Sequence, residues 1–130
     1  RALHFQRVKQ QPKLVRCIWG HVWDVVVDLR KDSPTFQKWL AFDLIGEKHN
    51  EILVPAGCAH GYLVLEDSIV SYKCGEKFYG EYDDGIMWND SDIGVAWPLE
   101  QVGGPEKVIL ADKDQNLQTF AQFMDSYGGF

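Results

Sequence analysis

Two of the four histidines lie in sequence contexts that suit acid–base chemistry. His4 stands among apolar residues inside a basic segment, and His60 follows the rigid turn PAGCA at 55–59 directly into a strand-like run. His21 and His49 stand where a surface position is the ordinary outcome. A lone histidine in a strand is more often a hydrogen-bonded core residue than a catalyst, so both interpretations of His4 and His60 stay open.

General acid–base chemistry needs further residue types around such a histidine. Neutral histidine, with a pKa of about 6.5, is a suitable base at neutral pH, and a carboxylate usually orients its ring. A lysine can stabilise an enolate oxygen, and a tyrosine can return a proton from the opposite face. The chain supplies all of these types. Their spacing does not establish that they converge.

A metal or redox function is disfavoured. Small β-barrels with a Pro-x-Gly-x-x-His turn often bind a metal, usually through an additional His-x-His pair and a glutamate. No His-x-His occurs here, so we expect neither a metal nor another cofactor. The three cysteines, Cys17, Cys58 and Cys74, show no CxxC spacing. They indicate reduced, mostly buried thiols in a cytoplasmic protein.

Length and charge narrow the class of protein further. With 130 residues and 45% apolar content, the chain predicts one globular domain. A net charge of −6 argues against nucleic-acid binding, and no apolar run is long enough to span a membrane. Five of the 13 basic residues fall within the first sixteen, where no acidic residue occurs. That segment could hold a small anion or form a solvated strand edge.

The elements that must position these side chains are mostly strands. Short runs rich in valine, isoleucine and aromatic residues predict strands at 3–6, 13–19, 21–30, 35–44, 52–54, 60–65 and 68–74. Turn residues separate them, including Gly20 and the Glu66–Asp67 pair. This spacing is typical of an all-β sandwich or barrel.

One strand and one helix stand out. The run at 23–29 is apolar on both faces, which predicts a central strand. Asp24 and Asp28 share one of its faces and must line a cavity, meet basic partners or be hydrogen-bonded inside the barrel. Helical spacing near the C-terminus predicts a short helix, with Asp112 or Asp114 as its N-terminal cap and the tail at 127–130 as its end.

Several long motifs resemble the dTDP-4-dehydrorhamnose 3,5-epimerase family. RALHFQ at 1–6 is similar to the family's RGLHFQ, and KLVR follows at 13–16. The likeness continues through DVVVDLR at 24–30, SPTF at 33–36, VPAGCAHGY at 54–62 and YKC at 72–74, and closes with GIMWND at 85–90, IGVAWPL at 93–99 and LADKD at 110–114. The order is kept, and the likeness covers nearly the whole chain.

The resemblance implies a fold, a partner and a reaction. It implies a cupin-type β-jelly roll with a short C-terminal helix, a homodimer, and no metal. The family's substrate is the nucleotide sugar dTDP-4-keto-6-deoxy-D-glucose, whose C3 and C5 protons both lie next to the C4 carbonyl. Removing either proton creates an enolate, and reprotonation on the other face inverts that carbon.

The resemblance also assigns roles to individual residues. His4 corresponds to the base, Asp114 to the carboxylate that orients it, Tyr72 to the acid on the far face, and Lys13 to the enolate partner. The remaining family positions bind substrate: they are Arg1, His60, Phe78, Asp83, Lys113 and the cavity-lining Asp24. Phe78 matches an aromatic residue that stacks on the thymine ring.

Three departures from the family pattern accompany these matches. Ala2 replaces the usual glycine, and Asp83 replaces the usual glutamate. We expect a single epimerase domain over residues 1–130 that lacks the family's N-terminal strand segment, which contributes nucleotide contacts across the dimer. Two alternatives to a double epimerase remain: an enzyme that epimerises C3 or C5 alone, and a non-catalytic cupin that binds nucleotide sugars. Retention of the His4, Asp114, Tyr72 and Lys13 set speaks against the second.

Overall fold

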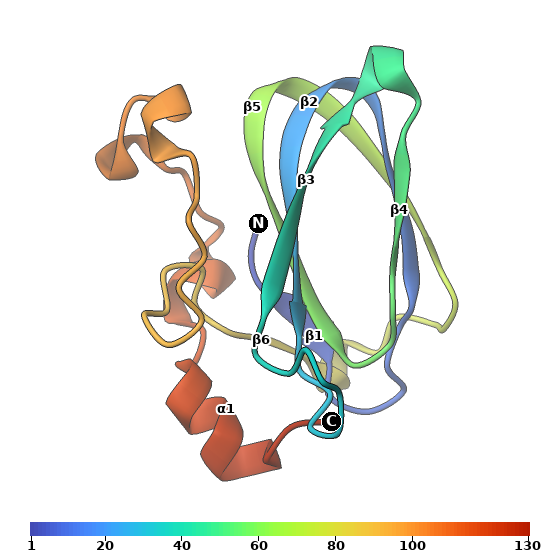
Figure 1. Cartoon of the computed structure of the whole chain (residues 1–130), viewed down its shortest axis with the longest axis vertical. Coiled ribbons are helices and arrows are strands. Elements are labelled where there is room, and N and C mark those ends of the chain that lie inside the picture. The colour runs from blue at the N-terminus through green and yellow to red at the C-terminus, as the bar shows by residue number, and fades with distance from the viewer.

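A computed structural model describes residues 1–130 and shows one curled antiparallel sheet. Its strands are β1 (His4–Gln6), β2 (Lys13–Asp28), β3 (Trp39–Ile45), β4 (Glu51–Val54), β5 (Cys58–Cys74) and β6 (Asp83–Gly85). They follow the order β3-β2-β5-β1-β6, and β4 pairs with the half of β2 that β3 leaves free. Figure 1 shows the strands wrapped around a shared interior, with the C-terminal third of the chain on one side.

The helices are short and lie outside the sheet. The only α-helix is α1 (Phe120–Tyr127), and 3-10 turns occur at Gly46–Lys48, Gly80–Tyr82, Leu99–Val102, Pro105–Lys107 and Asp112–Asn116. None of these helices has both the length and the apolar composition that a membrane span requires. The expected all-β fold with one short C-terminal helix is confirmed.

The two longest strands correct the sequence-based prediction. β2 and β5 run without interruption through Gly20 and through Glu66–Asp67, where turns were expected. The register between them shifts between Cys17 and Val22, which marks β-bulges. Gly20 has φ +89°, and a Cβ there would lie 2.1 Å from a backbone oxygen of β5. Glycine therefore serves a bulge at this position and not a turn.

The bulges decide which residues of β2 face the interior. Val15 and Cys17 precede the irregular region and Val22 follows it, yet all three are buried in one core inside the curl. A regular strand would alternate strictly and send Val22 to the other face. The bulges thus bring the side chains of Val15 and Cys17, before the irregular region, to the same face of the sheet as those of Val22 and Asp24, after it.

Two further boundaries differ from expectation. The strand predicted at 35–44 begins only at Trp39, because residues 30–38 form hydrogen-bonded turns. Neither Asp112 nor Asp114 caps α1. Thr119 does so in a capping box with Gln122, while the two aspartates open a separate 3-10 turn. The helix ends at Gly128 with φ +67°, as predicted.

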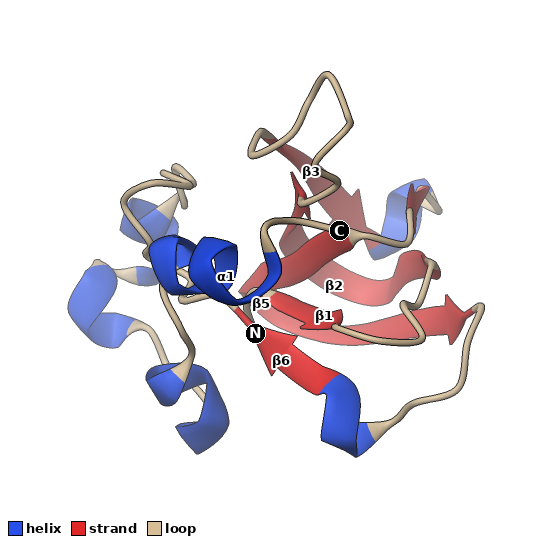
Figure 2. Ribbon diagram, turned by 90° about the horizontal axis from the view of Figure 1, so that it is seen from below, coloured by secondary structure: helices blue, strands red, loops and turns tan.

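A second core attaches the C-terminal segment to the sheet. Leu3, Val25 and Val27 pack on the sheet's other face with Phe120 and Phe123 of α1. The Phe5 ring meets the rings of Phe123 and Phe130 at centroid distances of 5.4 Å and 5.2 Å. Figure 2 shows α1 and the C-terminus beside β1. This packing fixes the position of the segment that carries Asp114.

Asp28 ends the central strand in a dense hydrogen-bond cluster. It is 6% exposed and accepts from the backbone and guanidinium nitrogens of Arg30 and from the hydroxyls of Ser33 and Thr35. Burial opposes ionisation, but these donors hold the pKa of Asp28 well below its usual range. Of the outcomes that the sequence left open for Asp28, the structure therefore shows pairing with a basic residue, Arg30.

Candidate active site

Strand register brings the acid–base side chains to one face of the sheet. His4 lies opposite His60, and Asp24 lies opposite Tyr62, while Lys13 and Tyr72 belong to the far halves of the β2–β5 pair. Residues directly opposite each other in an antiparallel sheet project to the same side. The result is a cleft of about 300 Å³. It is lined by Arg1, His4, Phe5, Gln6, Gln11, Lys13, His60, Gly61, Tyr62, Tyr72, Cys74, Phe78, Asp83 and Lys113.

His4 contacts a carboxylate behind the cleft wall. Its Nε2 lies 2.8 Å from Oδ1 of Asp114, whose side chain is 1% exposed. The approach is not aligned as a hydrogen bond, and the structure gives neither side chain another hydrogen-bond partner. The contact is therefore chiefly an attraction between charges once the ring is protonated. Burial lowers the pKa of His4 below its ordinary value of 6.5 despite Asp114, which favours a neutral ring at neutral pH.

His60 forms a second, better aligned pair with Asp24. Its Nε2 lies 3.0 Å and 2.8 Å from the two carboxylate oxygens of Asp24, which is fully buried. Burial raises the pKa of Asp24, and the bond from His60 opposes that rise. Asp24 thus lies behind the cleft and fixes the ring of His60 on the strand next to it.

Cations and phenols complete the cleft. Burial lowers the pKa of the Lys13 ammonium, and burial also raises the pKa of the Tyr62 phenol. Tyr72 is 42% exposed and Phe78 is 68% exposed. At the rim, Lys113 donates to Asp83 at 2.8 Å. Basic groups, a neutral imidazole and phenols therefore share one small opening, a set suited to moving protons on an anionic ligand.

The structure brings together all ten residues singled out from the sequence. Eight line the cleft, and Asp24 and Asp114 contact its two histidines from behind. Gln6 and Tyr62 also line the cleft, although the sequence had not marked them as candidates. Each follows a chosen histidine by two positions in the same strand, so the period-2 alternation was a usable signal for both.

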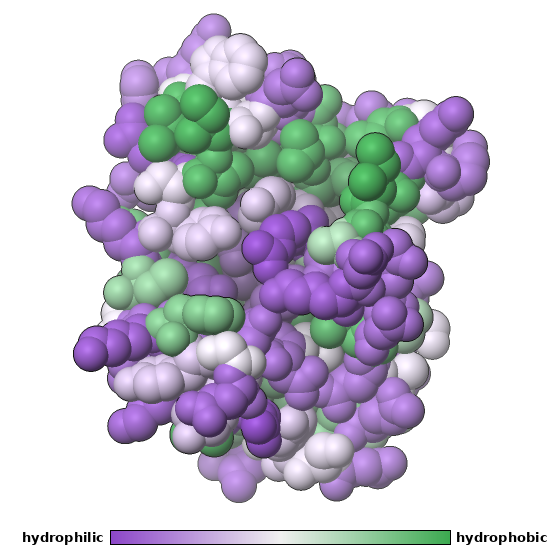
Figure 3. All heavy atoms as spheres, turned by 180° about the vertical axis from the view of Figure 1, so that it is seen from behind, coloured by the Kyte–Doolittle hydropathy of each residue, from purple (hydrophilic) through white to green (hydrophobic).

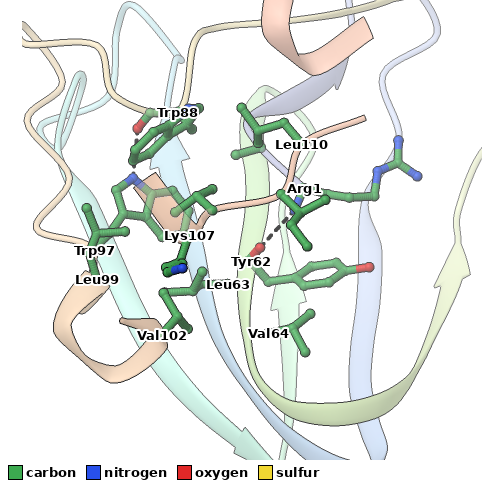
Figure 4. Close-up of a pocket in the computed structure, with 13 residues that line it drawn as sticks. Arg1, Tyr62, Leu63, Val64, Trp88, Trp97, Leu99, Val102, Lys107 and Leu110 are labelled. Atoms are coloured by element: carbon green, nitrogen blue, oxygen red, sulfur yellow. Dashed lines mark hydrogen bonds between the residues drawn. The ribbon is translucent and has the colours of Figure 1, made fainter. Parts of the chain in front are cut away.

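A separate apolar hollow lies on the other side of Tyr62. Figure 4 shows the side chains of Leu63 and Val64 on β5 facing Trp88 and Trp97 across it. The Arg1 backbone nitrogen donates to the Tyr62 carbonyl oxygen at 3.0 Å, and Trp97 Nε1 donates to the Trp88 carbonyl oxygen at 2.7 Å. The hollow contains no acid–base pair, so the candidate chemistry belongs to the polar cleft.

Fold and cleft together define a cupin-type barrel with an acid–base site in a polar opening of its sheet. No group of three or more histidine, cysteine, aspartate or glutamate side chains is arranged to hold a metal ion. The sequence pattern described as dTDP-4-dehydrorhamnose 3,5-epimerase matches residues 1–122. The chain belongs to this family.

Individual relatives support that membership. The chain is 51% identical over 117 residues to the dTDP-4-dehydrorhamnose 3,5-epimerase of Methanothermobacter thermautotrophicus, covering 89% of this chain and 62% of the relative. The solved structure of the enzyme from Elizabethkingia anophelis aligns with a TM-score of 0.88 at 40% identity, covering 94% of this chain and 66% of that one.

A third relative was solved with a nucleotide sugar. The dTDP-6-deoxy-D-glucose-3,5-epimerase of Legionella pneumophila, in complex with dTDP-4-keto-L-rhamnose, aligns with a TM-score of 0.84 at 36% identity. The alignment covers 92% of this chain and 61% of that one. The present chain thus spans about three fifths of the length of such relatives.

Proposed function

We propose that this protein epimerises C3 and C5 of dTDP-4-keto-6-deoxy-D-glucose to give dTDP-4-keto-L-rhamnose. The observation that carries the proposal is the buried contact of His4 with Asp114 in a cleft that also holds Lys13 and Tyr72. Binding alone needs no such acid–base set. Membership of the epimerase family supports the same reaction.

In the proposed first step, His4 removes a proton next to the C4 carbonyl. The C–H electron pair becomes the carbon–carbon double bond of an enolate, and the carbonyl oxygen takes the negative charge. Lys13 stabilises that oxygen, and Asp114 stabilises the imidazolium formed at His4. Burial keeps His4 neutral beforehand, so the ring is ready to accept the proton.

In the proposed second step, Tyr72 protonates the same carbon from the opposite face. The enolate collapses to the ketone and the configuration at that carbon is inverted. The imidazolium of His4 then releases its proton to solvent, and the tyrosinate of Tyr72 takes one up from solvent. Tyr72 suits this role because it comes from β5 and lines the cleft while remaining 42% exposed. Repeating both steps at the second carbon completes the double epimerisation.

Substrate binding is assigned to the rest of the cleft. Arg1 and Lys113 supply positive charge for the diphosphate, and Phe78 offers an exposed ring for the thymine. In this proposal His60, held by Asp24, and Asp83 contact the sugar. The complex of the Legionella relative with dTDP-4-keto-L-rhamnose supports a dTDP-linked substrate. The proposed reaction uses no metal or other cofactor.

We also propose a cytoplasmic homodimer. Large apolar side chains are exposed on the long strands, including Trp19 at 60% and Ile69 at 56%. Figure 3 shows apolar residues gathered toward one end of the rear face. Such patches often mark protein interfaces. Light scattering of the purified protein tests this proposal: a monomer at micromolar concentration would overturn it.

The reaction is tested by incubating the protein with dTDP-4-keto-6-deoxy-D-glucose and reading the configuration of the sugar by NMR. We expect inversion at both C3 and C5. Inversion at one carbon alone would identify a mono-epimerase. Binding of dTDP without any change in the sugar would identify a nucleotide-sugar-binding protein. Either of these results would overturn the double epimerase.

A further inference from the structure

We propose that Gln6 is a positioning residue for the nucleotide end of the cleft. Its carboxamide holds the loop segment at 77–79 and thereby the ring of Phe78. The inference rests on the proposed function, in which Phe78 stacks on the nucleobase. The amide of Gln6 is bonded to backbone groups on either side of Phe78, so it acts through that backbone.

The contacts of Gln6 bracket Phe78. The Gln6 Nε2 donates to the carbonyl oxygen of Lys77 at 3.2 Å, and the backbone nitrogen of Tyr79 donates to Gln6 Oε1 at 2.9 Å. A third bond joins Nε2 to the carbonyl oxygen of Lys9 at 2.6 Å. Both ends of the amide are therefore used. Gln6 is 4% exposed, so these bonds are poorly replaced by water.

Phe78 needs such support because the residue is 68% exposed. The ring makes no close aromatic pair within the chain, so its position in the cleft depends on how firmly the backbone at 77–79 is held. A ring that must stack on a base gains affinity when its backbone is already ordered, since less conformational entropy is lost on binding.

Gln6 also connects the nucleotide end to the catalytic end. His4 and Gln6 lie two residues apart in β1 and project to the same face, about 7 Å apart along the strand. The loop's first half has separate anchors: Gln11 donates to the Glu76 carbonyl oxygen at 2.8 Å, and the Gly75 nitrogen donates to the Pro12 carbonyl oxygen at 2.8 Å. Loss of Gln6 should therefore loosen only residues 77–79.

Amide hydrogen exchange tests the clamp without any ligand. In Gln6→Leu we expect the Tyr79 amide to exchange about tenfold faster, while exchange in β2 and β5 is unchanged. Gln101→Leu is the matched control, because Gln101 is exposed and lies far from residues 77–79 in the sequence. Unchanged Tyr79 exchange in Gln6→Leu would overturn the proposal. If Gln6→Leu does not fold, Gln6→Glu is the second variant. It keeps the acceptor for the Tyr79 amide but loses the donor to the Lys77 carbonyl oxygen, so the backbone at Lys77 should become more mobile.

Calorimetry with two probes tests the consequence for binding. Gln6→Leu should weaken dTDP binding about tenfold and leave binding of inorganic pyrophosphate within about twofold, because pyrophosphate has no base to stack. The double variant with Phe78→Ala should bind dTDP no more weakly than Phe78→Ala alone. Additive losses, or an equal loss for pyrophosphate, would overturn the inference.

The outcomes separate this inference from the proposed function. A wild-type protein that binds neither dTDP nor pyrophosphate contradicts the proposed function. Even in that case, amide exchange at Tyr79 in Gln6→Leu shows whether Gln6 holds the backbone at 77–79, because that measurement needs no ligand.

Discussion

The imidazole of His4 and the carboxylate of Asp114 meet at 2.8 Å although they come from opposite ends of the chain. Packing of Phe5 against Phe123 and Phe130 holds the C-terminal segment beside β1. That core therefore places a negative charge behind the ring of the proposed base, whose pKa is lowered by burial. The arrangement keeps the ring neutral at rest and supports it once it is protonated.

Asp114→Asn should lower kcat/KM about 100-fold, because the side chain keeps its shape but no longer stabilises the imidazolium. Steady-state kinetics with the dTDP-4-keto sugar measure the effect. Asp112→Asn is the control, since Asp112 lies in the same 3-10 turn and is exposed. A normal rate for Asp114→Asn would show that Asp114 does not assist His4.

The pH dependence of kcat/KM should report the lowered pKa of His4. The reaction needs the neutral ring, and burial disfavours its protonation, so activity persists as the pH falls below 6.5 and declines only nearer the pKa of the folded protein. A pH–rate profile measures the position of the acid limb. A limb centred at or above pH 6.5 would contradict this account.

Tyr72→Phe should separate proton removal from inversion. The proposed base His4 remains, so exchange of substrate protons with solvent should continue at a measurable rate, while net epimerisation falls at least about 100-fold without the phenol. Tyr127→Phe serves as a control, because Tyr127 lies in α1 and is not among the cleft residues. Net epimerisation by Tyr72→Phe at the full rate would show that another group returns the proton.

Asp28→Asn should cost about 2–3 kcal/mol of unfolding free energy at pH 7, since the charge-assisted bonds from Arg30, Ser33 and Thr35 are weakened. The pKa of Asp28 is lowered in the folded protein, so its contribution is fully present above the unfolded value of 3.8 and is lost as the pH falls below it. Urea unfolding at pH 7 and pH 3 measures both effects. An equal gap between variant and wild type at the two pH values would contradict the prediction.

The sequence predicted the fold class and the central strand because composition and alternation are local signals. It did not predict the continuity of β2 and β5. Gly20 is equally compatible with a turn or a bulge, and only the partner strand, with a backbone oxygen 2.1 Å from where a Cβ would be, decides between them. The cap of α1 was missed because two aspartates preceded Thr119 and competed as capping candidates.

The site was predictable only in part from the residues themselves. The surroundings of His4 and His60 marked them as candidates, but no spacing rule joins His4 to Asp114 or Asp24 to His60. Those pairs depend on strand register and on packing between distant segments. The resemblance to the epimerase family supplied the ten positions, and alternation along β1 and β5 would have added Gln6 and Tyr62.

The most direct test of the central claim follows solvent deuterium into the sugar. Wild-type protein in heavy water should place deuterium at both C3 and C5 of dTDP-4-keto-6-deoxy-D-glucose, and His4→Asn should place it at neither. His49→Asn is the control, because His49 is exposed and asparagine tolerates its left-handed backbone at φ +54°. Normal deuterium incorporation by His4→Asn would show that the base is another residue, and deuterium at C3 alone would contradict the double epimerisation.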